Sequence, residues 1–283
     1  DTANRWITFM KYRSGMDVGE KRRPQSGAMK YTLTNGTSIE LRLSVITNFK
    51  MQTSVVIRLL HLSMEENKSG ELSTYFPKDI ELLQKMLHYK SGLILFSGPT
   101  GSGKSTSLYK LASELANMNK QVITVEDPVE KKIPSLIQMQ VNEKAGINYD
   151  NALKSILRCD PDAMVIGEIR DYKTASQVIT SAFSGHLVLS TIHAEDSIGV
   201  INRLRDLNLS LEDIKQTVIC IISQRLVNLV NGKRGLVTEI LKKEDIHEYI
   251  DNNRIHKNSL EKKFELAYER GLITNDEKEK WGY

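Results

Sequence analysis

One short segment constrains this chain more than any other, because it matches a phosphate-binding spacing at every position. Its glycines, lysine and hydroxyls follow the pattern G-x-x-x-x-G-K-[ST]. The residues are Gly98, Pro99, Thr100, Gly101, Ser102, Gly103, Lys104, Ser105 and Thr106. The apolar run Gly92–Phe96 before it predicts a buried strand, and a helix is expected to begin near Lys104. A glycine-rich turn between a strand and a helix predicts a P-loop rather than a plain surface turn.

Nucleotide binding follows from the chemistry of this segment. The glycines let backbone N–H groups turn inward and cup phosphates, and the helix N-terminus adds a fixed positive dipole. Lys104 is expected to neutralise the β- and γ-phosphates, and Ser105 to offer its hydroxyl oxygen to Mg²⁺, with Thr106 in support. ATP and Mg²⁺ are therefore the predicted cofactors.

The order of strand-like and helical runs predicts the fold class. From Asp79 onward, short apolar runs alternate with runs of helical period. After the strand before the P-loop, the predicted strands are Gln121–Val125, Ala163–Ile166 and Leu187–Ile192, and the predicted helices are Tyr149–Arg158 and Tyr172–Phe183. Such alternation indicates an α/β fold with a mostly parallel sheet and helices on both faces.

Changes of pattern divide the chain into four regions. They are residues 1–68, a small α+β domain that is expected to be incomplete at its start; 69–78, a polar linker; 79–240, the α/β domain; and 241–283, a charged helical segment. The first region has strand-like runs at Met29–Leu33, Ser38–Ser44 and Ser54–Leu60. In the last region, Gly271 is the expected C-cap of a helix.

Composition bears on partners and location. The 283 residues carry 39 basic and 35 acidic side chains, a net charge of +4, and aromatics are 6%. Because this excess is small and no basic stripe is interleaved with aromatics, direct DNA binding is not expected. Cys159 and Cys220 match no metal spacing and suit a reducing cytosol. The longest uncharged stretch, Thr174–Ala194, is too polar to favour a membrane span, so a soluble protein is expected.

Three acids follow predicted strands, at the sheet edge where ligands of open α/β folds bind. Glu168 comes after Gly167, which takes the place of the usual strand-ending Asp, and we expect Glu168 to be the general base that positions the attacking water. Glu126 and Asp127 follow another strand. They are candidates for catalysis and for holding the metal or its waters, and a plain acidic turn before proline is the alternative.

Two histidines bracket the strand Leu187–Ile192. At the edge beside a P-loop, a histidine is able to sense the γ-phosphate, so His193 is a candidate catalytic residue and His186 a candidate nucleotide ligand. A lone histidine is more often structural, and that alternative stays open for both.

Four segments, in this order, resemble the ATPases of type II secretion and type IV pili. They are Glu126–Glu130, similar to the family's Asp box; Pro161–Asp171, similar to its variant Walker B; Ser184–His193, similar to its His box; and Gln224–Leu226, similar to the segment closing its motor domain. The resemblance implies a RecA-like P-loop motor domain, preceded by a PAS-like α+β domain and followed by short C-terminal helices. It also explains Gly167, because the family's own strand ends in Gly-Glu.

The same resemblance implies partners and further site residues. Residues 41–44 and 56–58 are similar to two N-terminal strands whose arginines reach over the nucleotide, which makes Arg42 and Arg58 candidate arginine fingers and Arg22 and Arg23 weaker ones. Without the resemblance, such arginines would be solvated face residues. Family membership implies a homohexamer in the cytoplasm, peripheral at the inner face of the cell membrane, working with a polytopic membrane platform protein.

Sequence features that differ between branches of this family narrow the set of expected functions. GspE and PilB proteins usually carry a tetracysteine zinc insert after the Gln-Arg-Leu segment, and residues 227–236 contain no cysteine, so no zinc is expected. Segments 20–27 and 140–146 are most similar to the Gram-positive competence branch, which implies assembly of a pseudopilus for DNA uptake. The alternatives are a PilT-type retraction motor, a type II secretion ATPase, a DNA-binding RecA-like ATPase, and a switch that binds ATP without turnover.

Overall fold

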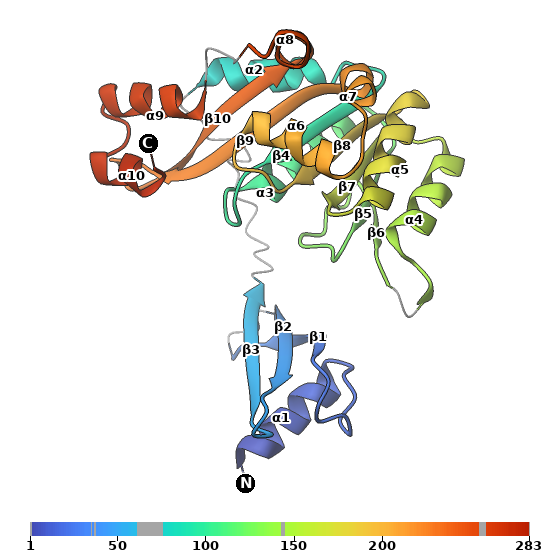
Figure 1. Ribbon diagram of the computed structural model, residues 1–283. Helices are drawn as coiled ribbons and strands as arrows, with labels where there is room; N and C mark the ends of the chain where they lie inside the picture. The colour runs from blue at the N-terminus through green and yellow to red at the C-terminus, as the bar shows by residue number, and fades with distance from the viewer. Residues whose placement is uncertain are drawn as a thin grey trace. The chain divides into compact units, whose positions relative to one another are not determined.

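The chain divides into two compact units, Asp1–Ser69 and Gly70–Tyr283. The computed structural model (Figure 1) describes residues 2–34, 36, 38–60, 76–142, 145–254 and 259–282. Most of the predicted linker, residues 69–75, lies outside the described residues, and its last two residues already belong to helix α2.

The first unit is a three-stranded antiparallel sheet with one helix. The elements are α1 (Thr2–Arg13), β1 (Gln25–Thr32), β2 (Ser38–Thr47) and β3 (Thr53–Leu60), and the sheet order is β1-β2-β3. The three predicted strands are confirmed, and α1 is an element beyond the predicted set. Leu43 and Val45 alternate with outward residues along β2 and form a small core with Met16 and Met29. One face of the sheet is thereby buried.

The second unit contains a seven-stranded sheet of order β10-β9-β4-β8-β7-β5-β6. Its strands are β4 (Gly92–Ser97), β5 (Val122–Glu126), β6 (Ile137–Gln140), β7 (Ala163–Ile169), β8 (Leu187–Ile192), β9 (Val218–Asn228) and β10 (Arg234–Lys242). Its helices are α2 (Pro77–Met86), α3 (Lys104–Asn117), α4 (Tyr149–Ile156), α5 (Tyr172–Phe183), α6 (Ser197–Asp206), α7 (Leu211–Thr217), α8 (Lys243–Asn252), α9 (Leu260–Glu269) and α10 (Asn275–Lys280).

The described pairings of this sheet are parallel except that of β10 with β9. The predicted strands and helices of the α/β region are confirmed, and so is the mostly parallel sheet. Strands β9 and β10 go beyond the predicted set. Buried polar residues, Ser223 and Gln224 among them, interrupt the apolar run of β9 and weaken its strand pattern.

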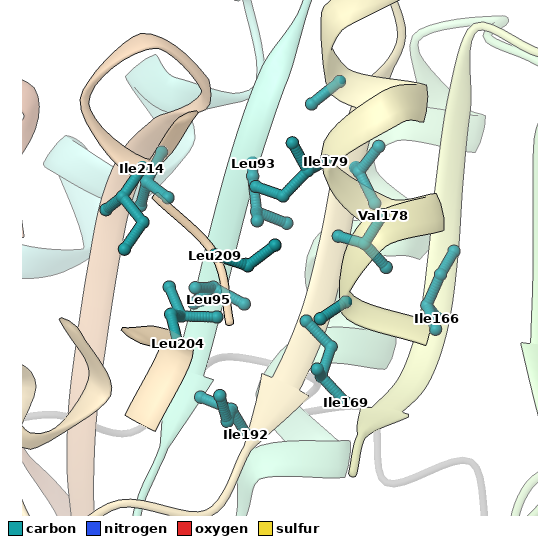
Figure 2. Close-up of a cluster of buried hydrophobic side chains, with 14 of the residues drawn as sticks. Leu93, Leu95, Ile166, Ile169, Val178, Ile179, Ile192, Leu204, Leu209 and Ile214 are labelled. Carbon is teal, nitrogen blue, oxygen red and sulfur yellow. The ribbon is translucent and has the colours of Figure 1, made fainter. Parts of the chain in front are cut away.

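Helices cover both faces of this sheet, as a parallel sheet requires. Along β4, Leu93 and Leu95 face one core, which they share with residues of α4 to α8, while Ile94 and Phe96 face the other, shared with α2 and α3. Figure 2 shows part of the first core, where Leu93 and Leu95 lie near Ile179 of α5 and Leu204 of α6. A strand buried on both faces reads as a continuous apolar run, which is why residues 92–96 predict it.

The C-terminal helices add a third core against the β9–β10 hairpin. Phe264 of α9 is fully buried with Val227 and Val237, and Trp281 packs partly buried beside them. Gly271 has a positive φ of 65° directly after the end of α9, as expected for a C-capping glycine. Residues after 241 therefore contribute to the core of the second unit.

We predict that Phe264→Ala lowers the free energy of unfolding of the second unit by about 3–5 kcal/mol, because it opens a cavity among fully buried side chains. Urea unfolding, followed by Trp281 fluorescence in a Trp6→Phe background, measures the loss. Tyr268→Ala is the matched control, since Tyr268 lies on the same helix and is 44% exposed. Equal losses for the two substitutions would contradict a packing role for α9.

Candidate functional site

The P-loop leaves the central strand β4 and enters α3 at Lys104. Gly98 has a φ of 138°, and a Cβ there would lie 2.4 Å from the backbone oxygen of Gln224. Only glycine fits this approach. The Lys104 ammonium donates to the carbonyl oxygens of Gly98 and Pro99, at 2.6 and 3.0 Å. Burial lowers the pKa of Lys104, and the negative charge of Glu168 acts in the opposite direction.

Strand β9 supports the loop from behind. The Gln224 side-chain amide is buried and donates from Nε2 to the carbonyl oxygen of Ser102, at 2.7 Å. The next residue, Arg225, donates from Nη2 to the carbonyl oxygen of Glu195, at 2.7 Å, in the segment after β8. In the sequence, the Gln-Arg-Leu motif points to these two residues. Their position as polar side chains within an otherwise apolar strand is a second signal of their role.

A pocket of about 480 Å³ lies between the P-loop and the carboxyl ends of β5, β7 and β8. Its lining includes, from the predicted site, Thr100, Gly101, Gly103, Lys104, Ser105, Thr106, Glu126, Asp127, Glu168 and His193. Parallel strands direct their carboxyl ends to one edge of the sheet, so residues far apart in the sequence meet there. The structure thus brings the P-loop, the three acids and one of the two histidines to a single cavity.

Glu168 is held between two basic side chains. Arg170 donates from Nε to its Oε2 at 2.7 Å, and Nε2 of His193 lies 3.1 Å from its Oε1. The hydrogen bond to Glu168 raises the pKa of Arg170. Arg170 lies inside the Walker B-like segment, but the motif assigns it no role. The fold turns the side chains of Arg170 and Glu168 toward each other, and only this contact shows that Arg170 holds the candidate base.

Glu126 is buried, and its carboxylate accepts from three side chains. Tyr109 donates its hydroxyl to Oε2, while Thr124 Oγ1 and Gln138 Nε2 donate to Oε1, at 2.6 and 3.1 Å. Its neighbour Asp127 is exposed. Of these two neighbouring acids, Asp127 therefore has the more accessible carboxylate.

A side chain at Gly167, such as the usual Walker B aspartate, would be in tight contact with its neighbours. A Cβ there would lie 3.2 Å from the hydroxyl oxygen of Tyr149 and 3.4 Å from the carbonyl oxygen of Val125. Burial and then the charge of Asp127 raise the pKa of Tyr149 to about 12, so this hydroxyl stays protonated. The pairing of β7 with β8 also shifts register between Ile166 and Ile169. Such an irregularity changes the direction of the side chains within it, and Glu168 is one of them.

The two histidines of the His box lie at opposite ends of strand β8. His193 directly follows the carboxyl end of β8 and lines the pocket. His186 precedes the same strand, where its carbonyl oxygen accepts from the N–H of Gly92 at the start of β4. Six strand residues separate them, a span of about 20 Å. Within this chain, His186 is therefore not among the residues that line the pocket, and its role as a nucleotide ligand stays a prediction.

The donor set of the pocket fits Mg²⁺. Ser105 lies in the first turn of α3, and the carboxylates of Asp127 and Glu168 line the same cavity. Mg²⁺ takes oxygen ligands, keeps several waters and needs only one or two protein oxygens when phosphates supply the rest. Across the described part of the chain, no cluster of three or more His, Cys, Asp or Glu residues is arranged to hold a metal ion.

Comparison with known proteins agrees with the motifs. The profile of the family described as type II/IV secretion system protein matches residues 1–272. The chain belongs to this family. The competence protein ComGA of Bacillus subtilis is 35% identical over 302 residues, covering 99% of this chain and 84% of its own length. ComGA of Streptococcus pneumoniae is 41% identical over 231 residues, covering 82% and 70%.

A solved structure of the family supports the fold. The pilus retraction motor PilT, determined with bound ADP, has a TM-score of 0.72 and 28% identity, and the match covers 90% of this chain and 77% of PilT. The predicted family and the RecA-like α/β fold are therefore confirmed. Among the described residues, this secretion-family chain contains no helix long and apolar enough to cross a membrane.

We predict that Gly167→Ala lowers the free energy of unfolding by about 1–3 kcal/mol, because the added methyl would lie 3.2 Å from the Tyr149 hydroxyl oxygen. In a Tyr149→Phe background the same substitution should cost less, since the hydroxyl oxygen is gone. Thermal unfolding of the four proteins of this cycle measures the difference. An equal cost in both backgrounds would show that Tyr149 is not what excludes a side chain at Gly167.

Proposed function

We propose that this secretion-family chain hydrolyses ATP to ADP and phosphate at the pocket described above, and that hydrolysis drives a motor. The observation that carries the proposal is the meeting of a complete P-loop and Glu168 in one cavity. The ADP bound to PilT, a relative of the same fold, supports a nucleotide as the ligand.

The P-loop supplies binding and charge neutralisation. Its backbone N–H groups and the N-terminus of α3 would hold the phosphates, with the Lys104 ammonium at the β- and γ-phosphates. Ser105 and Asp127 are the proposed protein ligands of Mg²⁺, which offsets phosphate charge when bound. To reach the phosphates, Lys104 exchanges its bonds to the carbonyl oxygens of Gly98 and Pro99 for phosphate oxygens.

Glu168 is the proposed general base. Its side chain is 18% exposed, at the carboxyl end of β7, and Arg170 and His193 fix the direction of its two oxygens. A carboxylate so oriented accepts a hydrogen bond from a water aligned with the γ-phosphate. His193, with 54% of its side chain exposed, is placed to contact a phosphate oxygen as well. Glu126 remains a candidate, but its three donors favour a supporting role.

We predict that Glu168→Gln keeps ATP affinity within about threefold and lowers kcat by about 10²–10⁴-fold, because an amide does not accept the proton of the water. Phosphate release and isothermal titration measure the two effects. Lys104→Ala is the contrasting variant, which should lose ATP binding. The assignment of the base is wrong if Glu126→Gln stops hydrolysis while Glu168→Gln does not.

Arg42 and Arg58 are proposed as arginine fingers. They pair directly across β2 and β3, on the sheet face opposite Leu43 and Val45. Arg42 is half-buried, and its Nη2 is fully buried without a hydrogen-bond partner among the described residues. An unsatisfied guanidinium nitrogen suits a residue that acquires an anionic partner in another state of the protein. We propose that this partner is the γ-phosphate, and that the fingers arrive when the two units close.

We predict that Arg42→Ala or Arg58→Ala lowers kcat by about tenfold to a thousandfold while changing ATP affinity much less, because the cations act on charge that develops in the transition state. Lys substitutions should rescue only partly, since a point charge lacks the bidentate fork. Steady-state kinetics measure the split. Lys30→Ala removes another cation from the same sheet face and is the control. An equal loss in Lys30→Ala would contradict a specific role for the two arginines.

At the level of the machine, we propose a homohexamer, peripheral at the cytoplasmic side of the cell membrane, that powers assembly of a competence pseudopilus with a polytopic membrane protein. The names of the two ComGA relatives support this branch. PilT, named a retraction motor, supports the alternative direction. A deletion strain scored for DNA uptake, surface pili and protein secretion separates the branches. DNA-stimulated turnover with steep salt dependence would instead favour a DNA-binding ATPase.

A further inference from the structure

Tyr109 carries a buried hydroxyl that the scheme above does not use. It lies on α3, the helix that begins with Lys104, and it lines the same pocket. It contacts the acidic segment, which we define as residues Glu126 to Glu130. The tyrosine is 8% exposed, so its hydroxyl depends on protein partners for its hydrogen bonds.

The hydroxyl of Tyr109 holds both ends of the acidic segment. It donates to Oε2 of Glu126, at the start of the segment, and it accepts from the backbone N–H of Glu130, at the end, at 3.2 Å. The exposed carboxylate of Asp127 lies between these two anchor points. One oxygen atom on the P-loop helix thus connects to both sides of the segment that presents Asp127.

Residues of strand β6 also hold the acidic segment. Gln138 donates from Nε2 to Oε1 of Glu126 and to the carbonyl oxygen of Lys131, at 3.1 and 2.9 Å. The backbone N–H of Val129 donates to Oε1 of Gln140 at 3.2 Å. These contacts tie the segment to its own edge of the sheet. Among the hydrogen bonds of the described residues, those of Tyr109 tie it to the helix that carries Lys104.

We propose that Tyr109 is a positioning residue for ATP turnover, and that it acts through Glu126 to set the acidic segment against the P-loop helix. The role rests on the proposed hydrolysis of ATP. It also gives Glu126 a task, as the buried anion that receives Tyr109, Thr124 and Gln138 and so fixes where Asp127 is presented.

The hydroxyl, rather than the ring, carries this role. Burial raises the pKa of Tyr109 above its ordinary value, with the Glu126 hydrogen bond adding to the effect, so the proton stays on the oxygen throughout the range where enzymes work. Phenylalanine fills almost the same volume. Its introduction leaves packing in place and removes one donor from a buried carboxylate and one acceptor from the Glu130 N–H. The expected loss is therefore in geometry at the pocket.

The test is Tyr109→Phe in the full chain, assayed by phosphate release over a range of ATP concentrations. We expect kcat to fall about tenfold to a hundredfold, the scale of one hydrogen bond to a charged group, while KM for ATP changes less than about threefold. Ser113→Ala is the control. It removes a hydroxyl from the same helix, one turn on, where the serine bonds the carbonyl oxygen of Tyr109 instead of the acidic segment.

A double-mutant cycle separates positioning from general destabilisation. If Tyr109 acts through Glu126, Tyr109→Phe should change kcat less than about threefold in a Glu126→Leu background, where no side-chain oxygen accepts the hydrogen bond. Thr124→Val, which removes another donor from the same carboxylate at matched shape, provides a second measurement if Tyr109→Phe does not fold. It should lower kcat in the wild-type background and add little to Glu126→Leu.

Each outcome decides the proposal. An active wild type with Tyr109→Phe within twofold of its kcat, or an equal fold-loss in the Glu126→Leu background, overturns the role of Tyr109 and leaves the ATPase intact. A wild type that binds ATP without releasing phosphate overturns the proposed hydrolysis, and the positioning role with it.

Discussion

The pairing of β4 with β8 on one side and β9 on the other is the constraint on which the site depends. Buried on both faces, β4 has no freedom to shift, so the loop that leaves it begins at a fixed point. Gln224 then holds the loop through Ser102, and the backbone approach at Gly98 is too close for any side chain. This packing fixes the position of the loop without a ligand.

The packing of the sheet also brings acidic side chains close together at the carboxyl ends of its strands. Four acids line one pocket. Glu126 is buried under three donors, Glu168 lies between Arg170 and His193, and Asp127 and Glu130 are exposed. Charges of one sign so close together are costly unless each has its own partners. The distribution of partners separates the buried carboxylate of Glu126 from the more accessible carboxylates of Glu168 and Asp127.

Local patterns in the sequence were enough to predict the P-loop, the α/β alternation and most strands of the sheet. The P-loop depends on residues that are adjacent in the chain, and strands such as Gly92–Ser97 are apolar because both their faces are buried. The buried polar residues of β9 hide that strand from the same reasoning. Their reason for being polar, a hydrogen bond from Gln224 to the P-loop, spans residues far apart in sequence.

The sequence by itself determined the chemistry available at this site: a lysine and hydroxyls in a glycine-rich turn, acids after strands, and histidines on either side of one strand. Tertiary structure alone decided which of these groups meet. The direction of β8 places His193 at the pocket and His186 at the opposite end of the strand. One partner of Glu126 is Tyr109, which lies 17 residues away in the sequence, on another element. Residue type sets what a side chain is able to do, whereas distance and burial, which depend on the whole chain, set what it does.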